Sequence, residues 1–106
     1  MPYIKLNEIE ERFLFDGYTA KIMHGDKLTV AHVTVKANSP LPEHKHPQEQ
    51  ILNLISGEFL FTCDGIEYHM RAGESFVIPS NVPHSAKSLT DCYIIDVFNP
   101  PRDDWK

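Results

Sequence analysis

Three histidines and one glutamine are the residues of this chain best suited to chemistry. His44, His46 and Gln50 lie in the segment PEHKHPQEQ, and His84 ends the later segment NVPH. On an extended segment His-x-His directs both imidazoles to one face, because side chains alternate along a strand. Gln50 lies four residues after His46, so its side chain points to the same face if the strand is not bulged. Imidazole-rich sites suit Zn, Ni, Cu, Fe or Mn, so the spacing predicts one divalent transition-metal centre.

The neighbours of these residues leave one alternative open. Glu49 rivals Gln50 as a ligand; parity directs it and Lys45 away from the site, but Pro47 could introduce a bulge. Gln48 has the inward parity and is expected to line the pocket. A glutamine ligand brings no negative charge, so a shell containing Gln50 would leave a stronger Lewis acid facing an anionic ligand.

The other three histidines, His24, His32 and His69, are interpreted as structural. A lone histidine on a strand more often hydrogen-bonds a neighbour than binds a metal.

A second group of reactive residues lies near the C-terminus. Asp96 interrupts the otherwise apolar strand CYIIDVF, and an unpaired buried carboxylate is costly, so it needs a partner. Phe98 shares its parity and can face the same cavity. Arg102 follows Pro-Pro, which limits its range, and a guanidinium can bind a carboxylate bidentately. Asp96 and Arg102 could also pair with each other and hold the tail down.

These residues must be positioned by short strands, because turn residues recur every eight to twelve positions. Asp64-Gly65, between two alternating runs, is the strongest hairpin signal. Only the range 6–15 hints at a helix, with Asn7 as its N-cap, and residues 12–15 could equally be a strand. The predicted strands are Tyr3–Leu6, Tyr18–His24, Leu28–Lys36, Gln50–Ile55, Glu58–Cys63, Ile66–Arg71, Ser75–Ile78, His84–Leu89 and Cys92–Phe98.

Length and composition predict one all-β domain, a sandwich or barrel, over residues 1–106. The formal charge of −5, without a Lys/Arg cluster, argues against nucleic acid as a partner. No apolar run has membrane length and no signal peptide is evident, so we expect a soluble cytoplasmic protein. Cys63 and Cys92 are expected to be reduced core thiols.

The ranges 38–57 and 73–88 resemble the two motifs of the cupin superfamily, with every ligand spacing kept. Asn38, Asn81 and Ser88 replace turn residues of those motifs, and asparagine tolerates positive φ. Gln50 stands where the commonest pattern has Glu. The resemblance implies a cupin β-barrel (a jelly roll or double-stranded β-helix) with its core at about 17–99 and a C-terminal tail at 100–106.

The tail narrows the resemblance to the small KdgF-type cupins of pectin and alginate degradation. It implies His44, His46, Gln50 and His84 as metal ligands, and Asp96, Phe98 and Arg102 as substrate residues. The implied reaction opens a 4,5-unsaturated uronate ring and ketonises it, with a sugar acid as substrate and a homodimer as assembly. Three alternatives stay open: a cupin dioxygenase, a non-catalytic sugar- or metal-binding module, and a cupin that has lost its metal.

Overall fold

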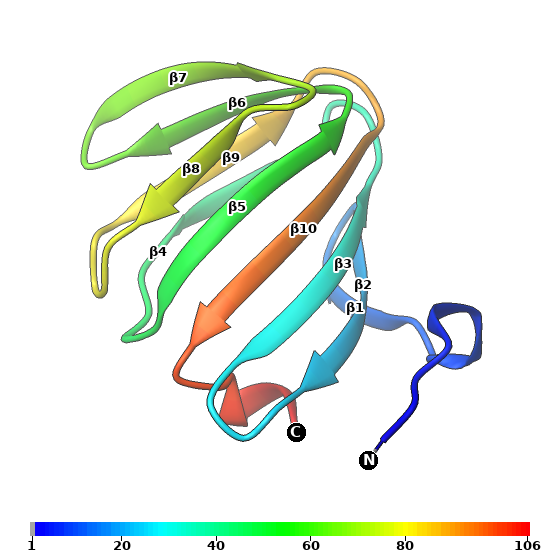
Figure 1. The fold of residues 1–106 in the computed structure, drawn as a ribbon. Helices are drawn as coiled ribbons and strands as arrows, with labels where there is room; N and C mark the ends of the chain where they lie inside the picture. Colours follow the sequence, from blue (N-terminus) through cyan, green and yellow to red (C-terminus); the bar gives the residue numbers. More distant parts are fainter. Residues whose placement is uncertain (1) are drawn as a thin grey trace.

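The protein folds into two facing antiparallel β-sheets, described over residues 2–106 by a computed structural model (Figure 1). The six-stranded sheet has the order β1-β2-β3-β10-β5-β8 and the four-stranded sheet the order β4-β9-β6-β7. This architecture confirms the predicted all-β class. The strands are β1 (Arg12–Phe15), β2 (Tyr18–His24), β3 (Thr29–Val35), β4 (Pro40–His44), β5 (Glu49–Ser56), β6 (Glu58–Cys63), β7 (Ile66–Arg71), β8 (Ser75–Ile78), β9 (His84–Ser88) and β10 (Cys92–Asn99).

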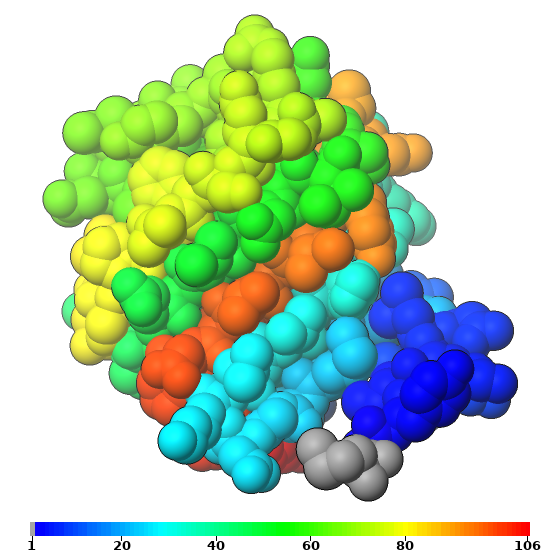
Figure 2. All heavy atoms as spheres, in the orientation of Figure 1, coloured from blue at the N-terminus to red at the C-terminus, as the bar shows by residue number. Residues whose placement is uncertain are grey.

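The core lies between the sheets because buried and exposed residues alternate along the central strands. Leu52 and Leu54 of β5, Phe59 and Phe61 of β6, and Ile94 of β10 are each at most 3% exposed. Figure 2 views the outer face of the larger sheet, where the colours of β8, β5, β10 and β3 follow one another. The inner face of β10 is therefore where functional side chains can meet residues of the opposite sheet.

The predicted turns form where the sequence places them. Asp64 and Gly65 have φ of 51° and 79°, and they join β6 to β7 as the predicted hairpin. Asn38 and Asn81 also have positive φ, 59° and 61°, so both asparagines adopt the conformation for which glycine is usual.

The first residues differ from the prediction. The predicted strand Tyr3–Leu6 is wrong: Tyr3 is 85% exposed and pairs with no strand in the described part of the chain, and a 3₁₀ helix, η1 (Leu6–Glu8), follows it. Lys5, not Asn7, occupies the N-cap position. The alternative for residues 12–15 is confirmed, since β1 pairs with β2 at the edge of the larger sheet.

In the described part of the chain, helix is confined to η1 and to η2 (Asp103–Trp105), each of three residues. Within residues 2–106, no helix has the length and apolar character required to cross a membrane.

The histidine segment is not one continuous strand, contrary to the parity argument from the sequence. β4 ends at His44 in the smaller sheet, and β5 begins at Glu49 in the larger one. Between them the backbone oxygens of His46 and Pro47 accept hydrogen bonds from Asn81 N–H, at 2.8 Å, and from the Ser80 hydroxyl, at 2.5 Å. The chain thus crosses from sheet to sheet at the point where its ligand candidates lie.

The two thiols, Cys63 and Cys92, are free and buried, so both lie in the core as predicted.

Candidate metal centre

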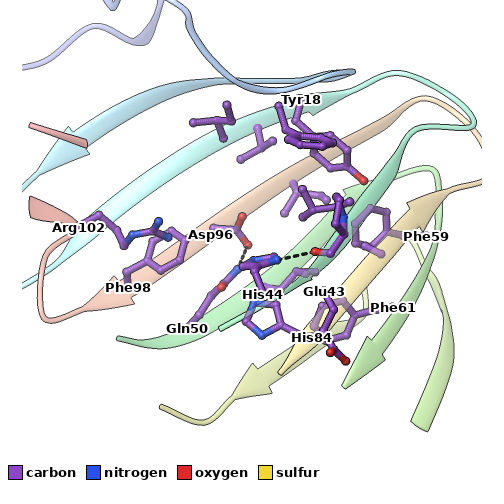
Figure 3. A pocket seen from close by; sticks show the side chains of 18 of the residues that line it. Tyr18, Glu43, His44, Gln50, Phe59, Phe61, His84, Asp96, Phe98 and Arg102 are labelled. Atoms are coloured by element: carbon purple, nitrogen blue, oxygen red, sulfur yellow. Dashed lines mark hydrogen bonds between the residues drawn. The ribbon is translucent and has the colours of Figure 1, made fainter. Parts of the chain in front are cut away.

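Three histidines, His44, His46 and His84, lie close together, and Figure 3 shows two of them, His44 and His84, side by side in the cavity. His44 ends β4, His46 lies in the crossing loop, and His84 opens β9. His44 and His84 are direct partners in the β4–β9 ladder, which brings their ring centroids to 4.3 Å. One ring nitrogen from each histidine lies within 4.8 Å of the others, as a shared metal ligand set requires.

Backbone carbonyls orient all three imidazoles. Each ring contacts a carbonyl through Nδ1, and a carbonyl can only accept, so Nδ1 carries the proton and Nε2 keeps its lone pair. Fixing one ring nitrogen in this way is how proteins prepare the other for a metal. The acceptors are Pro42 for His44, Gln48 for His46 and Val82 for His84, at 2.9, 3.0 and 2.8 Å.

The chemistry of this donor set fits a metal. His84 Nε2 is buried without a hydrogen-bond partner among residues 2–106, and an unpaired buried nitrogen is destabilising on its own. Burial lowers the pKa of His84 to about 4 and also lowers the pKa of His46, whose second cause is the charge of Arg102. Both rings are therefore neutral near pH 7, the form that binds metal ions.

Gln50 links the histidines to Asp96. Its Oε1 lies 3.1 Å from His46 Nε2, and its Nε2 donates to Asp96 Oδ1 over 2.8 Å. Because the amide nitrogen is engaged by the carboxylate, the amide oxygen is directed at the histidine cluster. The rival Glu49 is exposed, as is Lys45, so this geometry favours Gln50 as the fourth ligand.

Asp96 has an unusual proton affinity for a carboxyl group. Burial raises its pKa to about 7, although the hydrogen bond from Gln50 and the positive charge of Arg102 both act to lower it. A carboxyl group with such a pKa can accept or release a proton near neutral pH.

Asp96 and Phe98 line the same cavity, as their shared parity on β10 predicts (Figure 3). The cavity has a volume of about 320 Å³, with His44, His84 and Gln50 among its polar lining residues. Its remaining wall is mainly apolar. The Phe98 ring lies edge-on to His46, with centroids 5.6 Å apart.

Arg102 also lines the cavity, but it does not pair with Asp96 as the sequence alternative allowed. Its Nε and Nη2 donate to the two carboxylate oxygens of Asp104, at 3.1 and 2.9 Å. The guanidinium carbon lies 3.9 Å from the ring centroid of Trp105 and 4.9 Å from that of Phe98. Cation–π contact and ion pairing together hold this side chain at the cavity wall.

Trp105 and Asp104 were not predicted as site residues. The signal for them was the segment RDDW, in which an aromatic and an acidic side chain follow the arginine within three positions. Their contacts with Arg102 arise only when η2 forms.

Gln48 is buried as its parity suggests, yet it is not a cavity-lining residue, so that expectation is wrong. Its Nε2 donates to the backbone oxygen of Pro101 over 3.2 Å, because the C-terminal tail passes over the start of β5.

The remaining histidines have local partners, in agreement with their structural interpretation. Their side-chain contacts are His24 with Thr29, His32 with Tyr93 and His69 with Glu58.

Comparisons with known proteins agree with this architecture. The family model for the cupin domain matches residues 31–98. Two solved structures, each with a TM-score of 0.92, are KdgF from Halomonas sp. (27% identity, covering 100% of this chain and 99% of that one) and an RmlC-like cupin from Shewanella frigidimarina (25% identity, covering 98% and 95%). The HTH-type transcriptional regulator PuuR of Escherichia coli K12 is 36% identical over 91 residues, which are 79% of this chain and 49% of PuuR. The chain thus spans about half the length of the first curated relatives it matches. With a match to the family model over more than half of its residues, this chain belongs to the cupin domain family.

Proposed function

We propose that this cupin is a metal-dependent isomerase that opens the ring of a 4,5-unsaturated monouronate and ketonises it to the linear keto acid, in the breakdown of polyuronates. The observation that carries the proposal is the Gln50–Asp96 hydrogen bond of 2.8 Å, in a cavity that Arg102 also lines. A carboxyl group with a pKa of about 7 is thus linked through Gln50 to His46, and it lines the same cavity as the Arg102 guanidinium. The structural similarity to KdgF supports the same choice.

The metal would be held by His44, His46, His84 and Gln50. Bound there, a divalent ion would supply Lewis acidity that polarises oxygen atoms of the sugar acid.

Arg102 would bind the substrate carboxylate, and Phe98 would provide an apolar wall. Arg102 is suited to this role because Trp105 and Asp104 restrict its side chain. The positive charge would orient an anionic six-carbon sugar, for which a cavity of about 320 Å³ has an appropriate size.

Asp96 would move the proton. The hemiacetal hydroxyl loses a proton as the ring C–O bond opens, which gives an aldehyde and an enolate, and the enolate takes up a proton on carbon to become the ketone. Substrate and product have the same composition, so the reaction needs no oxidant. Since Oδ1 is engaged by Gln50, Oδ2 is the atom of Asp96 available to accept and return the proton.

A second candidate function is binding without turnover. It is favoured by the 36% identity with PuuR, which is a transcriptional regulator. In that case the same cavity would bind a small anionic ligand, and Asp96 would have no chemical role.

The deciding experiment mixes the Ni- or Zn-loaded protein with an unsaturated monouronate under anaerobic conditions. Loss of the ultraviolet absorbance of the conjugated acid, faster than in buffer with metal alone, together with the keto acid in the NMR spectrum, is the expected result. Calorimetric binding of the uronate without acceleration would support the binding module instead. Turnover that appears only when the assay is repeated with dissolved O₂ would indicate a dioxygenase.

A further inference from the structure

One peptide unit at the cavity wall is held on both of its polar sides. The carbonyl oxygen of Pro101 accepts from Gln48 Nε2 at 3.2 Å, and the N–H of Arg102 donates to Thr29 Oγ1 at 2.9 Å. Gln48 lies between β4 and β5, whereas Thr29 begins β3. Two buried side chains from distant parts of the chain therefore fix the backbone from which the Arg102 side chain leaves.

We infer that Gln48 and Thr29 are positioning residues that place the Arg102 guanidinium relative to the histidine cluster. This inference rests on the proposed function, in which Arg102 binds the carboxylate of the substrate. Neither residue lines the cavity, so both would act through Arg102 and not by touching the substrate.

Two partners of the guanidinium lie in its own segment, the C-terminal tail of residues 100–106, and its contact with the barrel is the Phe98 ring at 4.9 Å. Asp104 and Trp105 belong to that segment, so they fix the Arg102 side chain relative to it, and the Trp105 ring packs edge-on against Phe98 of β10 with centroids 5.2 Å apart. Hydrogen bonds tie the segment to the barrel through Gln48, through Thr29 and, at its far end, through Arg12, whose Nη1 donates to the Trp105 carbonyl over 2.6 Å. Of these three, only Gln48 and Thr29 hold the peptide unit next to Arg102.

The environment of Gln48 argues against a role in stability alone. Its side chain is 8% exposed, and Oε1 is buried with no partner among the described residues. An unpaired buried amide oxygen is destabilising, so an apolar side chain of the same length would suit packing better. The hydrogen bond from Nε2 to the Pro101 carbonyl explains why an amide side chain stands at this position. The backbone oxygen of Gln48 also accepts from His46 Nδ1, so the same residue adjoins the histidine cluster and the tail.

Thr29 is suited to accept the hydrogen bond from the Arg102 N–H because a second contact, with His24, orients its hydroxyl. It is fully buried, and Oγ1 lies 2.9 Å from His24 Nδ1. If the hydroxyl donates to His24, its lone pairs remain for the N–H of Arg102. A valine at this position keeps the shape and strand preference of threonine but removes the acceptor.

The test uses Thr29→Val and Gln48→Met, each of which removes one contact with little change in size. Thr29→Ser retains the hydroxyl as the conservative variant. Thr34→Val is the matched control, because Thr34 is an exposed residue of the same strand. For the unsaturated uronate we expect KM to rise on the order of tenfold in the first two variants, with kcat and metal content within about twofold of wild type. Thr29→Ser should restore KM.

A second readout is independent of the substrate. Trp105 is the single tryptophan of the chain and stacks on Arg102, so its fluorescence reports the seating of the segment. Thr29→Val and Gln48→Met should shift its emission to the red and increase quenching by acrylamide, whereas Thr34→Val should not.

The outcomes separate the two proposals. If the wild-type protein does not turn over the uronate, the proposed function fails, and the fluorescence still decides whether the two residues seat the segment. Unchanged emission in both variants would overturn the inference. So would a fall in kcat with lost metal and unchanged KM, or altered emission with unchanged KM.

Discussion

Gln50 donates from Nε2 to Asp96 Oδ1 over 2.8 Å while its Oε1 lies 3.1 Å from His46 Nε2. One amide thus contacts both the histidine cluster and Asp96, the carboxyl group that β10 contributes to the cavity wall. A glutamate could not make both contacts in its ionised form, since a carboxylate has no proton to donate. The neutral amide is what allows Asp96 to lie so close to the predicted ligands.

Replacing Gln50 with Glu should therefore increase the affinity for the metal and lower the activity. Two carboxylates at this distance cannot both be ionised without strong repulsion, and a negative ligand weakens the Lewis acid. We expect kcat for the uronate to fall about tenfold or more while the metal dissociation constant, measured by calorimetry, decreases. Glu49→Gln, the opposite change at the exposed neighbour, should alter neither. Metal loss in Glu49→Gln would show that Glu49 is the ligand.

Replacing Asp96 with Asn should remove the proton-transfer group and keep the site intact. Initial rates should fall by roughly 10²–10⁴-fold, the usual contribution of a general acid or base, with metal content unchanged by elemental analysis. Asp26→Asn, at an exposed turn, is the control for loss of one carboxylate. Full activity of the Asp96→Asn protein would exclude this residue from the mechanism.

Metal should stabilise the fold through His84. A ligand that binds only the folded state adds about 2.7 kcal/mol to the free energy of unfolding at 100 times its dissociation constant, so Ni or Zn should raise the melting temperature of the wild type and EDTA should reverse the rise. In His84→Ala we expect no such rise. His69→Ala, whose ring contacts Glu58 outside the cavity, should respond to metal as the wild type does. Retained metal stoichiometry in His84→Ala would refute the proposed ligand set.

The Arg102–Asp104 pair should be visible as a low carboxyl pKa. The hydrogen bonds from Arg102 lower the pKa of Asp104, so this group stabilises the folded state above the pKa it has when unfolded. That stability is lost as the pH falls through its lower folded value. Asp104 is largely exposed, so the contribution is at most about 1 kcal/mol. An NMR titration should show the Asp104 pKa returning toward its ordinary value in Arg102→Gln. An unchanged value would mean that the pair does not persist in solution.

The local features of this fold follow from the sequence because they depend on neighbouring residues. Asp64-Gly65 forms the predicted hairpin, since the turn demands positive φ at both positions. Asp96 and Phe98 share a face because side chains alternate along any strand. The candidate ligands His44, His46, Gln50 and His84 were also identified from spacing and family resemblance, and the structure brings them together.

The way in which those residues meet depends on the tertiary fold. The histidine segment crosses between sheets instead of continuing as one strand, so Gln50 reaches the cluster from β5 and not through shared parity with His46. Gln48 holds the tail, and Arg102 stacks on Trp105 and pairs with Asp104 instead of Asp96. Local periodicity specifies the face on which a side chain lies. It cannot specify which distant backbone or ring that face contacts, because this depends on where the chain crosses and how both sheets close around the cavity.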